Sequence, residues 1–171
     1  MKIALAAIAL LAPGTAWAAS GDIGCIEAKL GPEAMARIGA NVVAAADKGG
    51  DGSTVLDTDR EALIAARGAC RAAGNWSPDA IQAAVSYTQA RATKLGAEAA
   101  LKADGLDPAN LSADYAALPV QDRKSLIEKA SPGAVAAITA AASTPARRRH
   151  VLLLFSALAA IEFYPAEFAA A

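Results

Sequence analysis

Aromatic residues and histidine are scarce in this sequence, and neither sign of charge predominates. Aromatic side chains make up 5% of the 171 residues, there is one histidine, and the formal net charge is −1. The balanced charge excludes a general nucleic-acid binder, which needs a basic excess. The shortage of aromatic and β-branched residues disfavours β-sheet architecture. A hydrophobic content of 55% with low net charge excludes disorder for most of the chain.

Alanine takes the place of the missing large side chains. The chain has 49 alanines, and alanine is the best helix-forming residue. The sequence therefore predicts an all-α fold, a compact bundle of about six to eight short and medium helices. Because alanine lets neighbouring backbones approach closely, we expect thin seams between these helices.

The first residues have the pattern of an export signal. A charged start at Lys2 precedes an apolar run over 3–12, and the small-residue site Ala16-Trp17-Ala18 follows. This order predicts a signal peptide over 1–18, cleaved after Ala18, and one helical domain over 19–171. The alanine-rich signal favours a bacterial periplasmic location, with secretion as the alternative.

Two membrane attachments are disfavoured. Cys25 follows small residues as a lipoprotein cysteine does, but it lies far beyond the apolar run, and Ala18 offers a better cleavage site. The last predicted helix has only about eleven apolar residues before Glu162, too few to cross a bilayer. We therefore expect no lipid anchor and no transmembrane segment in the mature chain.

The two cysteines of the chain, Cys25 and Cys70, remain after cleavage. An even, minimal number of cysteines in an oxidising compartment predicts one disulfide. Their spacing is far from that of a C-x-x-C redox motif. With His150 they would still lack a fourth ligand for zinc. Leu63 and Cys70 share a helix face, so we expect Cys70 to point inward, whereas Cys25 lies at the edge of its own apolar stripe. This predicts a bridge at the rim of the core.

Prolines after capping residues mark helix starts. The side chain of Ser, Thr or Asp at the N-cap accepts a hydrogen bond from a free backbone N–H of the first turn. Proline at the next position costs no hydrogen bond, because the N–H that it lacks would have no partner within the helix. This pattern occurs at Ser77, Asp107, Ser131 and Thr144. Together with apolar periodicity and glycine stops, it predicts helices over 22–30, 32–47, 58–73, 78–103, 108–118, 119–130, 132–142 and 145–164.

Asp47, Asp51 and Asp57 form a weak candidate metal site. Asp47-x-Gly-x-Asp51-Gly resembles the first half of an EF-hand calcium loop, with glycine at the sharp turn. However, Gly49 replaces a ligand, and Thr58 stands where the bidentate glutamate belongs. A solvated loop is therefore the favoured interpretation, and no cofactor is predicted.

Two further groups are candidate contact residues. The first comprises Arg147, Arg148 and Arg149 at the start of the last helix, where free N–H groups and guanidiniums describe an anion or acidic-partner contact. A solvated or carboxylate-paired cluster is the simpler interpretation. The second comprises Phe163, Tyr164 and Phe168, which either cap the core or present an apolar contact surface.

No nucleophile–base pattern is found in the sequence. We therefore expect a non-enzymatic binding or interaction protein of the cell envelope, with an unidentified protein partner. One alternative is a binder of a small apolar ligand inside the bundle, which a pocket would favour. Another is a carboxylate-dependent enzyme, which two buried carboxylates facing a cleft would favour.

Overall fold

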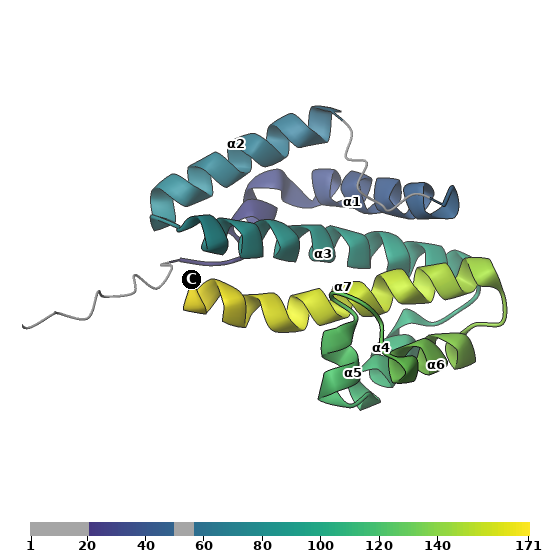
Figure 1. The fold of residues 1–171 in the computed structure, drawn as a ribbon. Coiled ribbons are helices and arrows are strands. Elements are labelled where there is room, and N and C mark those ends of the chain that lie inside the picture. The colour runs from purple at the N-terminus through teal and green to yellow at the C-terminus, as the bar shows by residue number, and fades with distance from the viewer. Residues whose placement is uncertain (1–20, 50–56) are drawn as a thin grey trace, which may run out of the picture.

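The computed structural model describes residues 21–49 and 57–171, and every regular element in this part of the chain is a helix (Figure 1). The all-α prediction is therefore confirmed. The helices are α1 (Cys25–Asp47), α2 (Asp57–Gly74), α3 (Pro78–Ala103), α4 (Pro108–Ala117), α5 (Val120–Ser125), α6 (Pro132–Ala141) and α7 (Pro145–Ala170).

The predicted helix starts are confirmed in four helices. In α3, α4, α6 and α7 the cap side chain accepts a hydrogen bond from a backbone N–H of the first turn, with proline at the next position. The caps are Ser77 to Ala80 N at 3.0 Å, Asp107 to Ala109 N at 2.9 Å, Ser131 to Ala134 N at 3.1 Å and Thr144 to Arg147 N at 3.3 Å.

Two helix boundaries differ from the prediction. The helix expected to stop before Pro165 continues through it to Ala170, and its last turn is held because Phe168 is buried against Trp76. The helix expected over 119–130 ends at Ser125. There the Ser125 hydroxyl donates to the carbonyl of Asp122 at 2.7 Å and competes with the helical backbone bonds.

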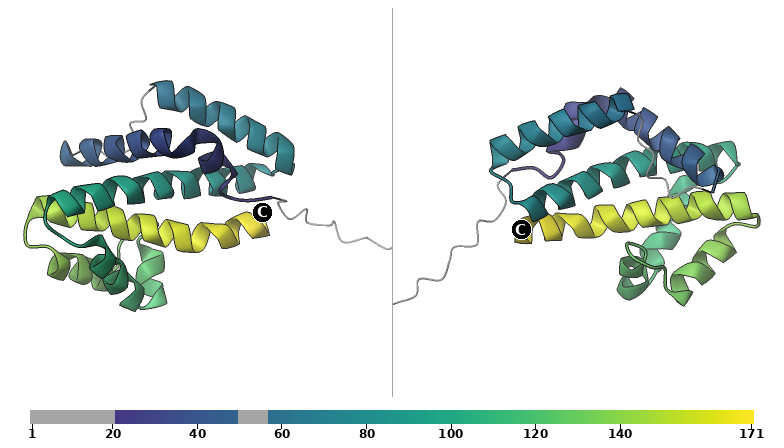
Figure 2. Two further views of the ribbon diagram at one scale, coloured as in Figure 1. Left: turned by 180° about the vertical axis from the view of Figure 1, so that it is seen from behind. Right: turned by 45° about the horizontal axis from the view of Figure 1, so that its top comes forward.

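The long helices α3 and α7 lie side by side and run in opposite directions (Figure 2). Helix α1 packs on α3, and α2 lies on α1, while α4, α5 and α6 form a small group beside α7. Helix α1 has two helical parts that meet at Gly31, whose φ of 76° is not helical. The predicted break at this glycine is therefore present as a kink in α1.

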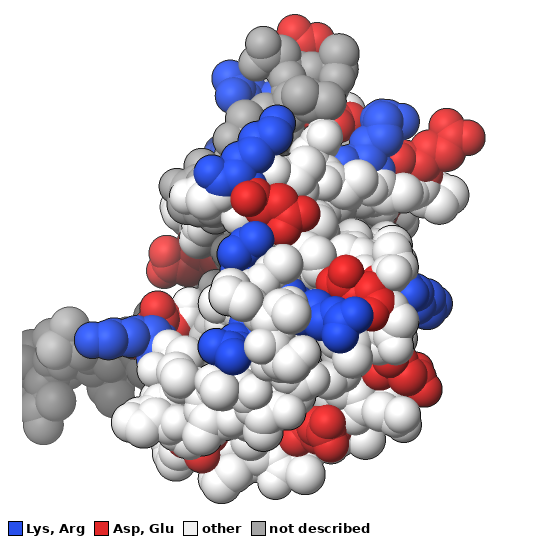
Figure 3. Space-filling view, turned by 90° about the vertical axis from the view of Figure 1, so that its right-hand side faces the viewer, with Lys and Arg blue, Asp and Glu red and all other residues white. Residues whose placement is uncertain are grey.

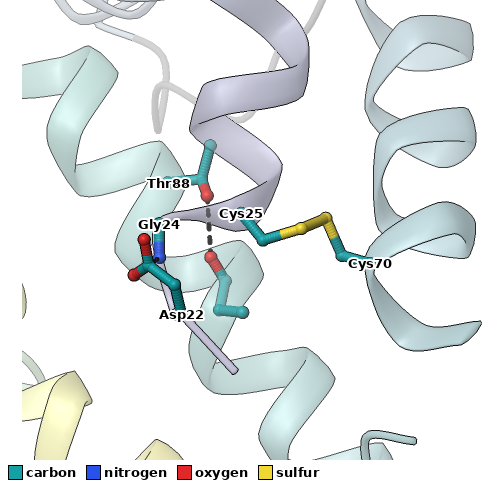
Figure 4. The surroundings of a disulfide bond; sticks show 6 residues. Asp22, Gly24, Cys25, Cys70 and Thr88 are labelled. Carbon is teal, nitrogen blue, oxygen red and sulfur yellow. Dashed lines mark hydrogen bonds between the residues drawn. A yellow bond between two sulfur atoms is a disulfide. The ribbon is translucent and has the colours of Figure 1, made fainter. Parts of the chain in front are cut away.

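The disulfide joins α1 to α2, as the cysteine count predicts. The Cys25 and Cys70 sulfur atoms are 2.05 Å apart, across 45 residues of sequence. Cys70 is fully buried and Cys25 is half-buried, which places the bridge at the edge of the core. Figure 4 shows it beside the start of α1, where the Asp22 carboxylate accepts a hydrogen bond from Gly24 N at 2.8 Å.

The expectation that the last helix is too short in apolar residues to cross a bilayer is wrong by length and composition, because α7 continues through Pro165 and has a window of 18 residues apolar enough to do so, 33% of which is buried. Its buried residues include Val151, Leu154 and Phe155, which belong to the largest core cluster with side chains from α3, α4 and α6. Glu162, further along α7, is bound by two polar side chains of the group α4–α5. In this fold, part of α7 therefore packs in the core.

Candidate binding groove

An apolar groove runs along the junction of α1 and α3. It has a volume of about 350 Å³, within the range of small-molecule sites. Its walls carry alanine, valine, leucine and glycine, with one carboxylate: Ala36, Ala40, Val43, Ala44 and Asp47 from α1, and Leu95, Gly96, Ala99 and Ala100 from α3. These walls can bind apolar groups by excluding water, and their one charged group accepts hydrogen bonds.

The groove exists because α1 and α3 meet backbone to backbone at its floor. A Cβ atom on Gly96 would collide with the carbonyl of Gly39, and one on Gly39 would collide with the carbonyl of Ala92. Only glycine permits this approach. Since the neighbouring positions are mostly alanine, the side chains leave space above the crossing instead of filling it.

An ion pair joins the start of α1 to the middle of α3. The Arg91 guanidinium donates from Nε to Glu27 Oε2 at 3.0 Å and from Nη2 to Oε1 at 3.2 Å. The hydrogen bond with Glu27 raises the pKa of Arg91. This forked contact joins the part of α1 that precedes Gly31 to α3.

Asp47, at one end of the groove, belongs to a polar cluster that ties three helices together. His150 of α7, which is 7% exposed, places Nε2 3.1 Å from Asp47 Oδ1 and Nδ1 2.9 Å from Asp104 Oδ2. Arg149 Nη2 lies 3.7 Å from the same Asp47 oxygen. The imidazole therefore connects the C-terminal ends of α1 and α3 to the start of α7.

The three arginines of the predicted anion contact bind groups of the protein. Arg147 donates to the carbonyl of Asp104 at 2.7 Å, and Arg149 faces Asp47. Arg148 donates to the carbonyls of Ala142 at 3.0 Å and Ser143 at 3.2 Å. Each guanidinium is thus used for joining the start of α7 to neighbouring segments.

Of the three candidate metal ligands, the structure describes the side chain of Asp47 alone. Asp51 lies outside the described residues, as does the side chain of Asp57. Asp47 contacts His150 and Arg149 instead. Within 21–49 and 57–171, no group of three or more histidine, cysteine or acidic residues is arranged to hold a metal ion.

The aromatic segment near the C-terminus packs inward. Phe168 is 5% exposed and meets Trp76 edge to face, with the ring centroids 5.0 Å apart. Phe163 and Tyr164 are half-buried and pack against the core. Phe168 therefore packs in the core, and Phe163 and Tyr164 keep part of their surface exposed.

A second polar network joins α4, α5 and α7, and sequence reasoning missed it. The Tyr115 hydroxyl donates to Glu162 Oε2 at 2.7 Å, and Arg123 Nη2 donates to Glu162 Oε1 at 2.9 Å. Tyr115 is 5% exposed. Burial and the hydrogen bond to Glu162 raise the pKa of this phenol.

The raised pKa of Tyr115 predicts that the unfolding free energy of the protein falls at alkaline pH. An unfolded tyrosine ionises near about pH 10, whereas the folded phenol keeps its proton to higher pH. The stabilisation is therefore complete below about pH 10 and is lost as pH rises toward the folded-state pKa. The unfolding free energy of Tyr115→Phe should fall less steeply above about pH 10 than that of the wild type. Parallel slopes in denaturant titrations would contradict this assignment.

Comparison with known proteins gives no match: no family model matches the chain, and no curated protein or solved structure is significantly similar to it. The function is therefore argued from the groove itself. Of its lining, sequence analysis singled out Asp47 alone, as a metal ligand. The four-residue spacing of Ala36, Ala40 and Ala44 marks a smooth helix face, but its pairing with α3 required the tertiary structure.

Proposed function

We propose that this chain is an exported, non-enzymatic binding protein that holds a small apolar ligand in the α1–α3 groove. The observation that carries the proposal is the groove of about 350 Å³ whose lining is apolar except for Asp47. Burial of apolar ligand surface against such walls is favourable in water. No hydroxyl, thiol or imidazole group is among the nine lining residues.

The export part of the proposal rests on the first eighteen residues. Lys2, the apolar run over 3–12 and the Ala16-Trp17-Ala18 site follow one another in the order of a signal peptide. The Cys25–Cys70 disulfide agrees with an oxidising compartment. A periplasmic binding protein would meet its ligand outside the cytoplasm.

A small ligand is favoured over a protein partner because the aromatic segment is used internally. An apolar docking surface around Phe163 to Phe168 would require these side chains to be exposed, and Phe168 is 5% exposed. The arginines at the start of α7 likewise bind carbonyls and Asp47. The α1–α3 groove differs from these internally used groups in having an apolar lining that is open to solvent.

Filling the groove tests the proposal. We expect the exported protein to bind n-decanol or the neutral aromatic probe phenylnaphthylamine saturably, by calorimetry or fluorescence. Ala40→Phe, which places a ring in the groove, should weaken that binding at least about tenfold. Ala28→Phe on the same helix is the matched control, because Ala28 is exposed and does not line the groove.

The outcomes separate clearly. If Ala40→Phe and Ala28→Phe bind equally well, the ligand sits elsewhere and the groove assignment is wrong. If neither probe binds the wild type, an apolar binding function is contradicted. Circular dichroism of both variants checks that the helices are retained, so a loss of binding reports on the groove.

A further inference from the structure

We propose that α2 is a strap released by reduction: when a dithiol reduces the Cys25–Cys70 disulfide, α2 leaves the bundle and uncovers an apolar surface on α1 and α3. Three features of α2 support this device: its small buried surface, its imperfectly satisfied ion pair, and the unequal exposure of the two cysteines. The ligand groove is a separate matter, because none of its nine lining residues belongs to α2.

Helix α2 buries little of its own surface. Within 59–74 the buried side chains are those of Asp59, Ala66 and Cys70, and Leu63 is half-buried. Figure 3 shows charged side chains of both signs over the upper part of the molecule, where α1 and α2 lie. The outer face of α2 is therefore hydrated whether the helix is docked or released. Apart from the disulfide, few apolar contacts hold it in place.

The ion pair near the start of α2 is only partly satisfied. The Asp59 side chain is 1% exposed, and its Oδ1 accepts a hydrogen bond from Arg37 Nη2 at 3.0 Å. Its Oδ2 is also buried and has no hydrogen-bond partner among the described residues. A buried carboxylate oxygen without a donor costs free energy that hydration restores once the group is exposed. This pair therefore adds little to the attachment that the disulfide provides.

The inner face of α2 covers an apolar surface. Leu63, Ala66 and Cys70 belong to one cluster with Ile26 of α1 and Ile81 of α3, both of which are buried. The two other buried clusters of the described residues contain no residue of α2. Departure of α2 would therefore expose the surface around Ile26 and Ile81 and leave the packing of α1, α3 and α7 in place. Contiguous exposed apolar surface is typical of association sites.

The two cysteines differ in exposure, which sets the direction of the reaction. Cys70 is fully buried and Cys25 is half-buried (Figure 4), so a thiolate of the reductant attacks the sulfur of Cys25. The disulfide bond breaks, and Cys70 leaves as a thiolate that takes up a proton. The second thiolate of the reductant then attacks the mixed disulfide, and Cys25 leaves and is protonated. The protein gains two electrons and two protons, and the dithiol becomes a disulfide.

Release is tested by the reaction of Cys70 with N-ethylmaleimide in the full chain carrying Cys25→Ala. This variant leaves Cys70 without a sulfur partner and needs no reductant. If α2 is released, Cys70 should react within about tenfold of its rate in the urea-unfolded chain. A rate at least about a thousandfold slower than in the unfolded chain would show that α2 stays docked without the disulfide, and the strap would be wrong.

A thiol in another part of the core is the matched control. Ala159 of α7 is fully buried in a cluster without α2 residues, so Ala159→Cys is made in the Cys25→Ala/Cys70→Ala background. This thiol should react at least about a hundredfold more slowly than Cys70. Equal rates at the two positions would mean that the whole bundle opens, which contradicts release of α2 alone.

Reduction of the wild-type chain is the second test and needs no substitution. We expect dithiothreitol to raise the fluorescence of 1-anilinonaphthalene-8-sulfonate, which binds exposed apolar surface, at least about threefold. The far-UV circular dichroism should remain helical, and reoxidation should reverse the change. Unchanged fluorescence on reduction would contradict the uncovered surface. Loss of the helical signal would show global unfolding and would contradict the strap.

Discussion

Replacing Gly96 by alanine should destabilise the protein by about 3 kcal/mol or more. The added methyl group would collide with the carbonyl of Gly39, which is backbone and can move only if α1 moves. Because α1 packs on α3 along much of its length, the two helices would have to separate and lose apolar burial. Urea unfolding followed by circular dichroism measures the change in unfolding free energy.

Gly68→Ala is the matched control for this substitution. Gly68 lies within α2, and an added Cβ there meets nothing within 4 Å. Only the higher helix propensity of alanine then applies, so the unfolding free energy of this variant should rise by about 0.5–1 kcal/mol. If Gly96→Ala were as stable as Gly68→Ala, the close crossing of α1 and α3 would be wrong, and the groove above it would lose its floor.

Removing the Cys25–Cys70 bridge should cost about 3–4 kcal/mol of unfolding free energy. The bridge closes 45 residues of sequence, so its loss increases the conformational freedom of the unfolded chain. The double variant Cys25→Ala/Cys70→Ala is used because serine at position 70 would leave a buried hydroxyl. Denaturant titrations of the wild type with and without reductant, and of the double variant, measure the effect.

Adding reductant to the double variant is the control, because it should not change the unfolding free energy of a chain without the disulfide. The loss should be largest locally in α2, because this helix packs mainly on α1 and buries few apolar side chains, among them Ala66 and Cys70. Hydrogen exchange should therefore accelerate in α2 before α3 and α7. Uniform acceleration across all helices would show that α2 is not held by the disulfide in particular.

Local features of the fold could be predicted because their physics is local. A Ser, Thr or Asp followed by proline specifies the first turn of a helix through groups that are neighbours in the chain. Ser77 and Ser131 show this directly, since their hydroxyls accept the expected first-turn N–H groups. Pro165 failed as a stop signal because packing of Phe168 against Trp76, distant in sequence, keeps the last turn of α7 in place.

The candidate site followed from contacts between distant parts of the chain. Gly39 and Gly96 are ordinary small residues in the sequence, and only their juxtaposition forms the floor of the groove. Asp47 was considered for its acidic neighbours in sequence, whereas its contacts are His150 and Arg149 on α7. Tyr115 and Glu162 are likewise joined across 47 residues.

The sparse aromatics and abundant alanine by themselves determined a helical chain with thin seams, and the two cysteines determined one bridge. These conclusions depend on backbone propensity, local capping and the chemistry of residue types. The tertiary structure decided where the α1–α3 groove lies, because the crossing of α1 and α3 depends on glycines distant in sequence. It also decided which charged groups paired internally, since ion pairs form between whichever side chains packing brings within reach.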